Sequence, residues 1–538
     1  MRRGRLSADF DLAIVGSGFA GSLLACIARR LGLTAVLVEK ESHPRFAIGE
    51  SSSPLANVIL DQLAARYDLD WLRPFSAWGT WRSAHPGIDC GLKRGFTFYG
   101  HRAGEPFRAD PKRRNELLVA ASPRDAIADT QWNRAEFDAF LAGRARACGA
   151  DLLERTVLES FRGEGSSVRL EGKRGASDLR LRVRLVVDAS GPRGFLSRAL
   201  GIADAGFESL RASSALYSHF EGVRRLDGLP GFTGGETPPY PIDAAAVHHV
   251  LEGGWIWVLR FQSGLVSAGA SAKPALAARL RLEEGEPAWR RLLAELPTVA
   301  EQFAGSAAIR PFTFAPGMPF RSAAASGPGW AMLPSAAAFV DPMLSTGIPL
   351  ALLGVERIAR GLRDSWGSSG LAAAIGDCGT EALEEADRTA LLVSALSAAY
   401  GDFELFSRLT LLYFAAASHA EVRRRLDPEA RTSFLMGRHA RFGPALERIC
   451  RSVMRASRAG TLPGERETLM DDVLEAIEPL DIAGLSDAGR LNWHPVEAGP
   501  LLAGAAKVGA GRRQIEEMLE RTGFNGTPGV PAEAGAIS

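Results

Sequence analysis

The chain has 538 residues, of which 46% are hydrophobic and 23% charged, the composition of a soluble globular protein with room for more than one core. Its formal net charge of +1 excludes the strong positive field that recruits nucleic acid or acidic membranes, and no apolar stretch is uniform enough to span a bilayer. The five cysteines show no CxxC pair and no metal-ligand spacing, which favours a cytoplasmic location and predicts no metal site.

The first forty residues predict a βαβ unit. Residues 9–15 form the apolar run of a buried strand, GSGFAG opens a helix that runs to Arg30, and residues 34–40 predict a second buried strand. Polar and irregular segments are expected from there to about residue 130. Residues 133–150 then predict a helix, because apolar residues recur at every fourth position.

Later segments predict further strands, a second sheet and a helical C-terminal region. Residues 167–173 and 179–191 predict strands, and the second ends in a glycine turn. Broken strand signals at 205–310 predict a sheet that forms a second layer. From Gly329 the chain predicts a strand, a loop and a long helix, and the pattern is mainly helical from about 380 to 520.

Glycines in the first turn predict dinucleotide binding. Gly16, Gly18 and Gly21 follow the G-x-G-x-x-G spacing: the first makes the turn, the second admits a pyrophosphate and the third lets helix and strand pack closely. Glu39 ends the second strand, where an acidic residue accepts hydrogen bonds from a ribose. A late Asp-Pro loop at Asp341 leads into another helix, an arrangement that suits FAD and that an NAD domain does not need.

Lys93 is unusual in this composition. Only six of the 63 basic residues are lysines, yet one lies among glycines and aromatic residues in CGLKRGFTF. An amine can lose its proton when it is desolvated, whereas arginine stays charged. Lys93 is therefore a candidate catalytic residue, although its position alone favours a lysine on a surface strand.

These segments together resemble the flavin-dependent halogenases, and most closely the members that act on phenolic substrates. The resemblance extends from about Asp9 to about Leu426. It rests on the glycine fingerprint and on HPRFAIGESSSP, CGLKRGFTF, NRAEFD, GGWIWVLRF and LPSAAAFVDPMLSTGI. The fold that we expect is α/β, with an FAD-binding Rossmann-like domain of the flavin monooxygenase type, an inserted β-sheet substrate layer and a C-terminal helical region.

The same resemblance and the chain order predict the domain limits. Residues 1–380 would form the FAD-binding domain, with the substrate-binding sheet inserted at about 205–310. Residues 381–525 would form the C-terminal helical region that covers the substrate pocket. Residues 526–538 would be a flexible tail.

The resemblance implies a two-component reaction. A separate flavin reductase supplies FADH2 by diffusion, O2 converts it to a flavin C4a-hydroperoxide, and chloride or bromide reacts with this species to give hypohalous acid. Lys93 then delivers the oxidant to a phenolic or other electron-rich aromatic small molecule. The resemblance implies no nucleic-acid or membrane partner, and it allows a homodimer.

The resemblance also implies roles for individual residues. Lys93 would be catalytic, and the halide would bind at Thr346 and Gly347. The cofactor would contact Gly16, Gly18, Gly21, Glu39, Lys40, Arg45, Gly49, Glu50, Ser51, Arg134, Asp341, Pro342, Gly347 and Ile348. The substrate pocket would include Phe96, Phe98, Trp255, Trp257, Phe403 and Phe406, for each of which core packing is the alternative.

Two departures from the family pattern affect this interpretation. Leu259 and Arg260 stand where the family's tryptophan block has Ile and Pro. Leu344 stands where tryptophan-specific members carry a glutamate, which favours a phenol, because a phenol activates its own ring by ionising. The alternatives are a flavin-dependent aromatic monooxygenase (hydroxylase), a flavin reductase of prenyl-like double bonds, and a flavin-binding protein without activity.

Overall fold

The structure, a computed structural model, describes residues 5–232 and 236–525. The predicted βαβ unit is present: β1 (Arg5–Val15) and β2 (Ala35–Val38) are parallel, and α1 (Phe19–Arg30) connects them. The segment 526–538, for which a flexible tail was expected, lies outside the described residues.

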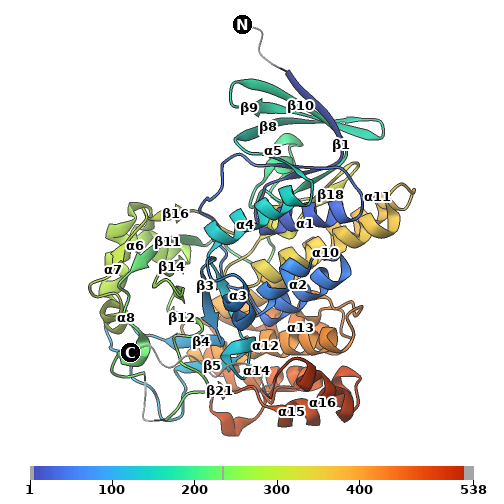
Figure 1. Cartoon of the computed structure of the whole chain (residues 1–538). Coiled ribbons are helices and arrows are strands. Elements are labelled where there is room, and N and C mark those ends of the chain that lie inside the picture. Colours follow the sequence, from blue (N-terminus) through green and yellow to red (C-terminus); the bar gives the residue numbers. More distant parts are fainter. Residues whose placement is uncertain (1–4, 233–235, 526–538) are drawn as a thin grey trace.

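The first large sheet contains the βαβ unit (Figure 1). Its strand order is β18-β19-β10-β1-β2-β7, with β9 paired to β10 and β8 to β9. Leu12 and Ile14 face the core that includes α1 and α10, whereas Ala13 and Val15 pack in the core that includes β8 to β10. Burial on both faces explains why these strands are apolar throughout. The strands not yet placed are β7 (Asp151–Leu153), β8 (Thr156–Glu164), β9 (Ser167–Arg174), β10 (Ser177–Asp188), β18 (Ser326–Gly327) and β19 (Trp330–Met332).

The second large sheet has the order β15-β11-β14-β13-β12-β4-β5-β21, with β16 on β11. Its strands are β4 (Gly95–Gly100), β5 (Glu116–Ala120), β11 (Ser214–Glu221), β12 (Ala246–Leu251), β13 (Gly254–Arg260), β14 (Val266–Ala272), β15 (Ala307–Ala308), β16 (Thr313–Ala315) and β21 (Trp493–His494). The expected second layer is therefore present, but it also recruits strands from outside 205–310. That segment itself includes three helices, α6 (Pro274–Leu280), α7 (Glu286–Ala294) and α8 (Pro297–Gln302).

The segment before residue 130 is more regular than the sequence predicted. It contains α2 (Pro54–Arg66), α3 (Trp78–Ala84), β3 (Cys90–Lys93), β4, β5 and β6 (Asp129–Trp132). Nine of the 13 residues of α2 are buried, so the helix shows no clear apolar stripe next to a polar face. Its start is nevertheless marked, because Ser53 caps the first turn and Pro54 occupies the first helical position.

Most of the remaining elements are helices (Figure 1). The middle of the chain contributes α4 (Arg134–Ala147), α5 (Phe195–Ala199), α9 (Pro334–Ala337) and α10 (Gly347–Ser365); the short strands β17 (Phe320–Arg321) and β20 (Ala338–Phe339) pair with each other. The C-terminal region has α11 (Leu371–Ala398), α12 (Phe403–Leu426), α13 (Phe442–Ala459), α14 (Leu462–Ile477), α15 (Ala498–Ala503) and α16 (Arg512–Arg521).

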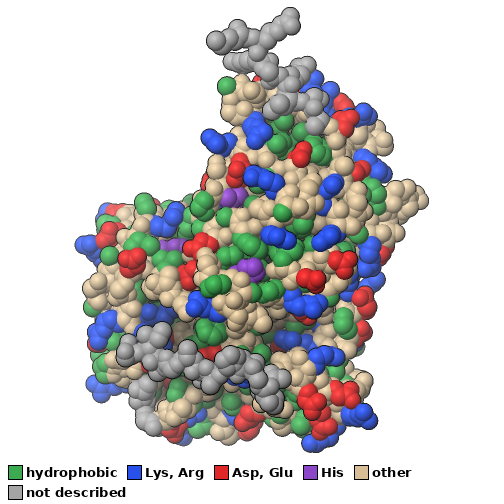
Figure 2. Space-filling model, in the orientation of Figure 1, with side chains coloured by type: hydrophobic (Ala, Val, Ile, Leu, Met, Phe, Trp, Pro, Cys, Tyr) green, Lys and Arg blue, Asp and Glu red, His purple; other side chains and the backbone are tan. Residues whose placement is uncertain are grey.

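Charges of both signs are interspersed over the face drawn in Figure 2, as expected for a chain with almost no net charge. Within residues 5–232 and 236–525, no helix combines the length and the apolar composition needed to cross a membrane.

Candidate functional site

The glycine turn after β1 is built for close approach of a ligand. Gly16 has φ 102, and a Cβ there would lie 2.6 Å from the carbonyl oxygen of Ala189 in the turn after β10. A Cβ on Gly21 would lie 2.1 Å from the Gly16 oxygen, so helix and turn pack at a distance that only glycine allows. A Cβ on Gly18, by contrast, would have no neighbour closer than 3.5 Å, and it would face the side chains of Arg45 and Arg134.

Charged side chains surround this turn. Glu39 is buried and accepts hydrogen bonds from the Ser17 amide (3.1 Å), the Ser17 hydroxyl (2.8 Å) and Arg45 (3.1 Å). Burial raises the pKa of Glu39, but the Arg45 charge and the hydrogen bonds from Glu41 and Ser17 outweigh it, so the pKa lies below its ordinary value. The carboxylate is therefore held ionised where a ribose would need an acceptor.

Arg134, at the start of α4, positions a second segment. It forms a bidentate pair with Asp138 (both 2.9 Å) and donates to the backbone oxygens of Ile48 (3.0 Å) and Gly49 (2.9 Å). Beyond Gly49, Glu50 is buried and lies 2.8 Å from His219. The predicted helix start and the HPRFAIGESSSP segment are thus in direct contact.

These residues fit an FAD molecule. Within residues 43–51, four buried polar atoms have no hydrogen-bond partner among the described residues: Nδ1 of His43, Nε of Arg45, Oε2 of Glu50 and Oγ of Ser51. They lie in the segments that border the glycine turn. A Cβ added to Gly18 or Gly49 would meet no atom closer than 3.5 Å, so the space beside both glycines is open. Lys40 differs from the other residues assigned to the cofactor, since its side chain is 73% exposed and pairs only with Glu41, at 3.8 Å.

The Asp341 loop lies between the first sheet's helices and the second sheet. Asp341 is buried and accepts hydrogen bonds from Ser271 of β14 (2.9 Å) and from the Met343 amide (3.0 Å). Burial raises its pKa to about 6. The backbone oxygen of Pro342 accepts a hydrogen bond from the Ser345 amide (3.0 Å), which closes a turn within the loop.

The loop ends at the N-terminus of α10. Thr346 is the capping residue, and Gly347 is the first helical residue, followed by the buried Ile348. The amides of Thr346 and Gly347 donate to no acceptor in the described part of the chain, and a Cβ on Gly347 would meet nothing within 4 Å. Free amides at the positive end of a 19-residue helix beside open space can hold a halide ion.

Lys93, the last residue of β3, is fully buried. Its Nζ donates to the backbone oxygen of Ser52, lies 3.5 Å from Oγ of Ser345, and sits 3.8 Å from the ring centroid of Phe96. Burial lowers its pKa, an effect that the charge of Asp129 opposes. A surface strand lysine is therefore excluded, and Lys93 joins the Asp341 loop to the aromatic residues of the second sheet.

Asp129 was not predicted from the sequence. It pairs directly with Lys93 across the antiparallel strands β3 and β6, and one of its carboxylate oxygens accepts from Asn57 (2.9 Å) while the other has no partner among the described residues. Burial raises its pKa, and the charge of Lys93 opposes that increase. Asn57, Ser52 and Ser345 were missed too; only Ser52 and Ser345 lie within motifs that the sequence had singled out.

A large cavity opens beside this lysine. Its volume is about 2430 Å³, and its wall includes Asn57 of α2, Phe96 of β4, and Tyr413 and Phe414 of α12. Phe96 lies edge-on to both Tyr413 (6.1 Å) and Phe414 (5.2 Å). Lys93 itself does not line the cavity, and Phe96 is the wall residue that contacts its amine.

The other aromatic residues assigned to the pocket lie behind this wall and do not line the cavity. Phe98 stacks on His248 at 4.4 Å, and Trp255 lies 5.2 Å from the same ring. Burial lowers the pKa of His248 to about 3, so its ring is neutral. Further ring contacts in this packed layer join Trp257 to Tyr217, Phe406 to Phe98, and Phe403 to Phe406.

Arg260, the main departure from the family pattern, points away from the site. Its guanidinium pairs with Asp243 at 2.7 Å and donates to the backbone oxygens of Val223 and Arg224. The side chain therefore ties the end of β13 to the 223–227 loop. Leu259 is buried in the same core as Trp255 and Trp257.

Comparison with known proteins agrees with this geometry. The family model described as FAD dependent oxidoreductase matches residues 11–338. The monodechloroaminopyrrolnitrin halogenase PrnC of Pseudomonas fluorescens is 26% identical over 371 residues, which cover 66% of this chain and 63% of that protein. The tetracycline 7-halogenase of Kitasatospora aureofaciens is 27% identical over 346 residues, which cover 63% and 60%. The match thus spans less than two thirds of either relative.

The fold is also found among solved structures. The crystal structure of halogenase PltM in complex with phloroglucinol and FAD superposes with a TM-score of 0.77 at 21% identity, covering 90% of this chain and 99% of that one. The predicted α/β fold and the resemblance to flavin-dependent halogenases are confirmed. Because its family model covers the βαβ unit, the Asp188 turn and most of the second sheet, the chain belongs to the FAD-dependent oxidoreductases, and FAD is its cofactor.

Proposed function

We propose that this protein is an FADH2-dependent halogenase that transfers an electrophilic halogen to a phenolic or other electron-rich aromatic substrate through Lys93. The observation that carries the proposal is the position of the Lys93 amine, which is buried between Ser345 of the Asp341 loop and Phe96 of the cavity wall. The similarity to halogenases from two bacteria supports the same class of reaction.

The residues of the chain would divide the reaction between two places. The amides of Thr346 and Gly347 would hold chloride or bromide, and reduced FAD with O2 would supply the oxidation that turns the halide into hypohalous acid. Burial favours a neutral Lys93, which can bind the halogen or hydrogen-bond hypohalous acid toward the ring. Ser52 and Ser345 would hold the amine at the junction of the two places.

A phenolic substrate suits the cavity wall next to Lys93. Phe96, Tyr413 and Phe414 offer aromatic faces and edges to a ring. Leu344 is fully buried among apolar residues, so the loop contributes no carboxylate at that position. The structure of PltM with phloroglucinol, a phenol, supports this substrate class.

The proposal includes the partners that the sequence suggested. A separate flavin reductase would supply FADH2 in the cytoplasm, and the protein would act alone or as a homodimer. The residue assignments given above for FAD, halide and substrate belong to the same proposal, as does the division into an FAD-binding domain and a helical C-terminal region.

Product analysis tests the proposal. The protein is incubated with FAD, a flavin reductase, NADH, bromide and a panel of phenols, and the products are analysed by mass spectrometry. A bromine isotope doublet is the expected result. Hydroxylated products without halogen would instead identify a monooxygenase, and oxygen consumption no faster than with free flavin would identify a flavin-binding protein without activity.

A further inference from the structure

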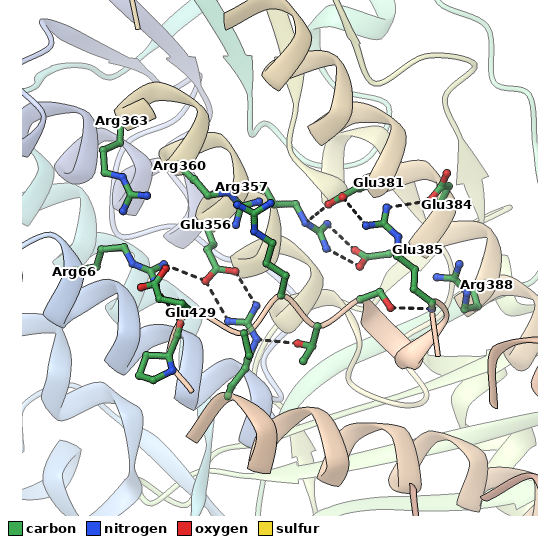
Figure 3. A pocket seen from close by; sticks show the side chains of 17 residues that line it. Arg66, Glu356, Arg357, Arg360, Arg363, Glu381, Glu384, Glu385, Arg388 and Glu429 are labelled. Carbon is green, nitrogen blue, oxygen red and sulfur yellow. Dashed lines mark hydrogen bonds and ion pairs between the residues drawn. The ribbon is translucent and has the colours of Figure 1, made fainter. Parts of the chain in front are cut away.

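A second cavity lies between four helices, away from the glycine turn (Figure 3). It has a volume of about 130 Å³ and is bounded by the C-terminal end of α2, the second half of α10, the middle of α11, the end of α12 and the loop 427–433. Eight arginines and five glutamates line it. Its lining therefore carries an excess of three positive charges, although the chain as a whole is nearly neutral.

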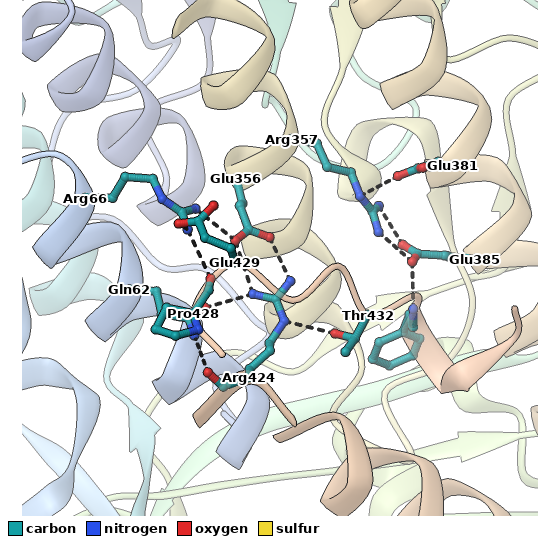
Figure 4. Close-up of polar contacts among 11 residues, drawn as sticks. Gln62, Arg66, Glu356, Arg357, Glu381, Glu385, Arg424, Pro428, Glu429 and Thr432 are labelled. Atoms are coloured by element: carbon teal, nitrogen blue, oxygen red, sulfur yellow. Dashed lines mark hydrogen bonds and ion pairs between the residues drawn. The ribbon is translucent and has the colours of Figure 1, made fainter. Parts of the chain in front are cut away.

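Four of the arginines form ion pairs with the five glutamates, and Figure 4 draws three of these arginines, Arg66, Arg357 and Arg424. Arg424 forms a bidentate pair with Glu356 (2.8 and 3.1 Å), and Arg357 forms one with Glu385 (2.6 and 2.7 Å). Arg66 lies 2.6 Å from Glu429, and Arg438 bridges the other two glutamates, Glu381 (3.0 Å) and Glu384 (3.7 Å). These pairs fix the wall of the cavity and leave no free carboxylate in it.

Arg363 pairs with Asp364 (2.7 Å), and the three remaining arginines have no acidic partner among the described residues. Arg360 of α10, Arg388 of α11 and Arg431 of the 427–433 loop form no ion pair or hydrogen bond with their side chains in the described part of the chain, yet all three line the cavity. Arg388 packs directly over Gly437, where a Cβ would lie 2.0 Å from its guanidinium. The missing side chain at position 437 thus makes room for a cation that no protein group neutralises.

Three unpaired guanidinium groups around one cavity repel each other, and an anion between them removes that repulsion. The planar fork of arginine matches the oxygens of phosphate, to which it donates charge-assisted hydrogen bonds in pairs. A single water needs about 10–15 Å³ of such space, so the cavity has room for a tetrahedral oxyanion.

We propose that this cavity binds a phosphate group, either as inorganic phosphate or as the phosphoryl end of a larger ligand, through Arg360, Arg388 and Arg431. The site is independent of halogenation, because it requires neither the Asp341 loop nor Lys93. Arg424 lines both this cavity and the large one beside Lys93, so an occupied phosphate site would be next to the substrate cavity.

Calorimetric titration of the full-length protein, saturated with FAD so that its pyrophosphate site is filled, tests the proposal. Inorganic phosphate is added in a chloride-free buffer of low ionic strength to the wild type, R388Q, R360Q and the double variant. The control is R290Q, which also removes one positive charge but lies on an exposed helix face in a pair with Glu286. We expect wild type and R290Q to bind alike, each single variant to bind about tenfold more weakly or worse, and the double variant not to bind.

A phosphate monoester, glycerol 2-phosphate, distinguishes the two sources: tighter binding than inorganic phosphate indicates a larger ligand, and weaker binding indicates the free ion. Thermal unfolding without phosphate gives a second readout. Since Arg360 and Arg388 have no acidic partner, their replacement should leave the unfolding temperature unchanged or raise it. Absence of binding by the wild type, equal binding by all variants, or a lower unfolding temperature of R388Q and R360Q without phosphate would each overturn the proposal.

Discussion

Lys93 and Asp129 occupy directly opposed positions on the antiparallel strands β3 and β6, and both side chains are buried. Each charge favours ionisation of the other group, while burial disfavours both. The charge state of each group therefore depends on that of the other. Asn57 holds one oxygen of the carboxylate, so the partner of the amine is fixed in place.

Replacing Lys93 should separate oxidant formation from halogen transfer. Lys93→Met removes the amine, and Lys93→Arg keeps the charge without a neutral nitrogen. Both variants should bind FAD and consume oxygen like the wild type, but lose ring halogenation by about two orders of magnitude or more, since the oxidant is no longer held at the acceptor carbon. Lys173→Met, on an exposed strand position of β9, is the control and should halogenate normally. Normal halogenation by Lys93→Met would refute the catalytic assignment.

Replacing Asp129 should move the pH dependence of halogenation. The negative charge of Asp129 raises the pKa of Lys93, so Asp129→Asn lowers it further. If the neutral amine is the active form, the acidic limb of the pH–rate profile moves to lower pH; if the ammonium is active, the alkaline limb moves to lower pH.

The limb that moves in Asp129→Asn thus identifies the active form of Lys93. Asp61→Asn is the matched control, because this half-exposed carboxylate lines the same cavity and should leave the profile unchanged. An unchanged profile in Asp129→Asn, or a move to higher pH, would contradict the coupling.

Gly347→Ala should weaken halide binding. The added methyl enters open space beside the free amides, and the residue has ordinary helical geometry, so the fold is expected to keep its stability. The KM for halide should rise, more for bromide than for the smaller chloride. Gly376→Ala on α11 also adds a methyl to open space and serves as the control. Equal KM values for both halides in Gly347→Ala and wild type would exclude the site.

Arg260→Gln should lower stability and spare the chemistry. The variant leaves the buried Asp243 without its ion-pair partner, which should reduce the free energy of unfolding by about 3 kcal/mol in urea denaturation. Arg224→Gln, whose partner Glu301 is 41% exposed, should cost less than about 1 kcal/mol. The halogenation rate per FAD-loaded molecule should equal that of the wild type. A folded Arg260→Gln protein without activity would place Arg260 in the site after all.

The sequence predicts the local parts of this fold well. The glycine turn, the flanking apolar strands and Glu39 lie within one short segment, so their spacing alone predicts how they meet. The strand β4 was missed because all but its last residue are buried and no alternation remains. α2 was missed because most of its residues are buried, so no polar face marks it as a helix, although Ser53 and Pro54 marked its start.

The site itself is harder to predict, because its central contacts join distant segments. Lys93 could be suspected from composition, but its pairing with Asp129 depends on the register of two strands, and its contact with Ser345 depends on how α10 returns to the second sheet. Nothing near Arg260 in the sequence shows that Asp243 is its partner. Side-chain direction at such positions follows from packing that local patterns do not encode.

The size of the cavity near Lys93 determines how strongly the protein can select substrates by their bulk. Pockets that enclose a drug-sized molecule usually measure about 300–1,000 Å³, whereas this one measures about 2430 Å³. A cavity this large does not exclude molecules by bulk, so discrimination falls to the short stretch of wall around Phe96, the wall residue that contacts the amine. For biocatalysis, this predicts a broad tolerance for large scaffolds together with narrow control over which carbon is modified, and it makes the wall around Phe96 the place to redesign regioselectivity.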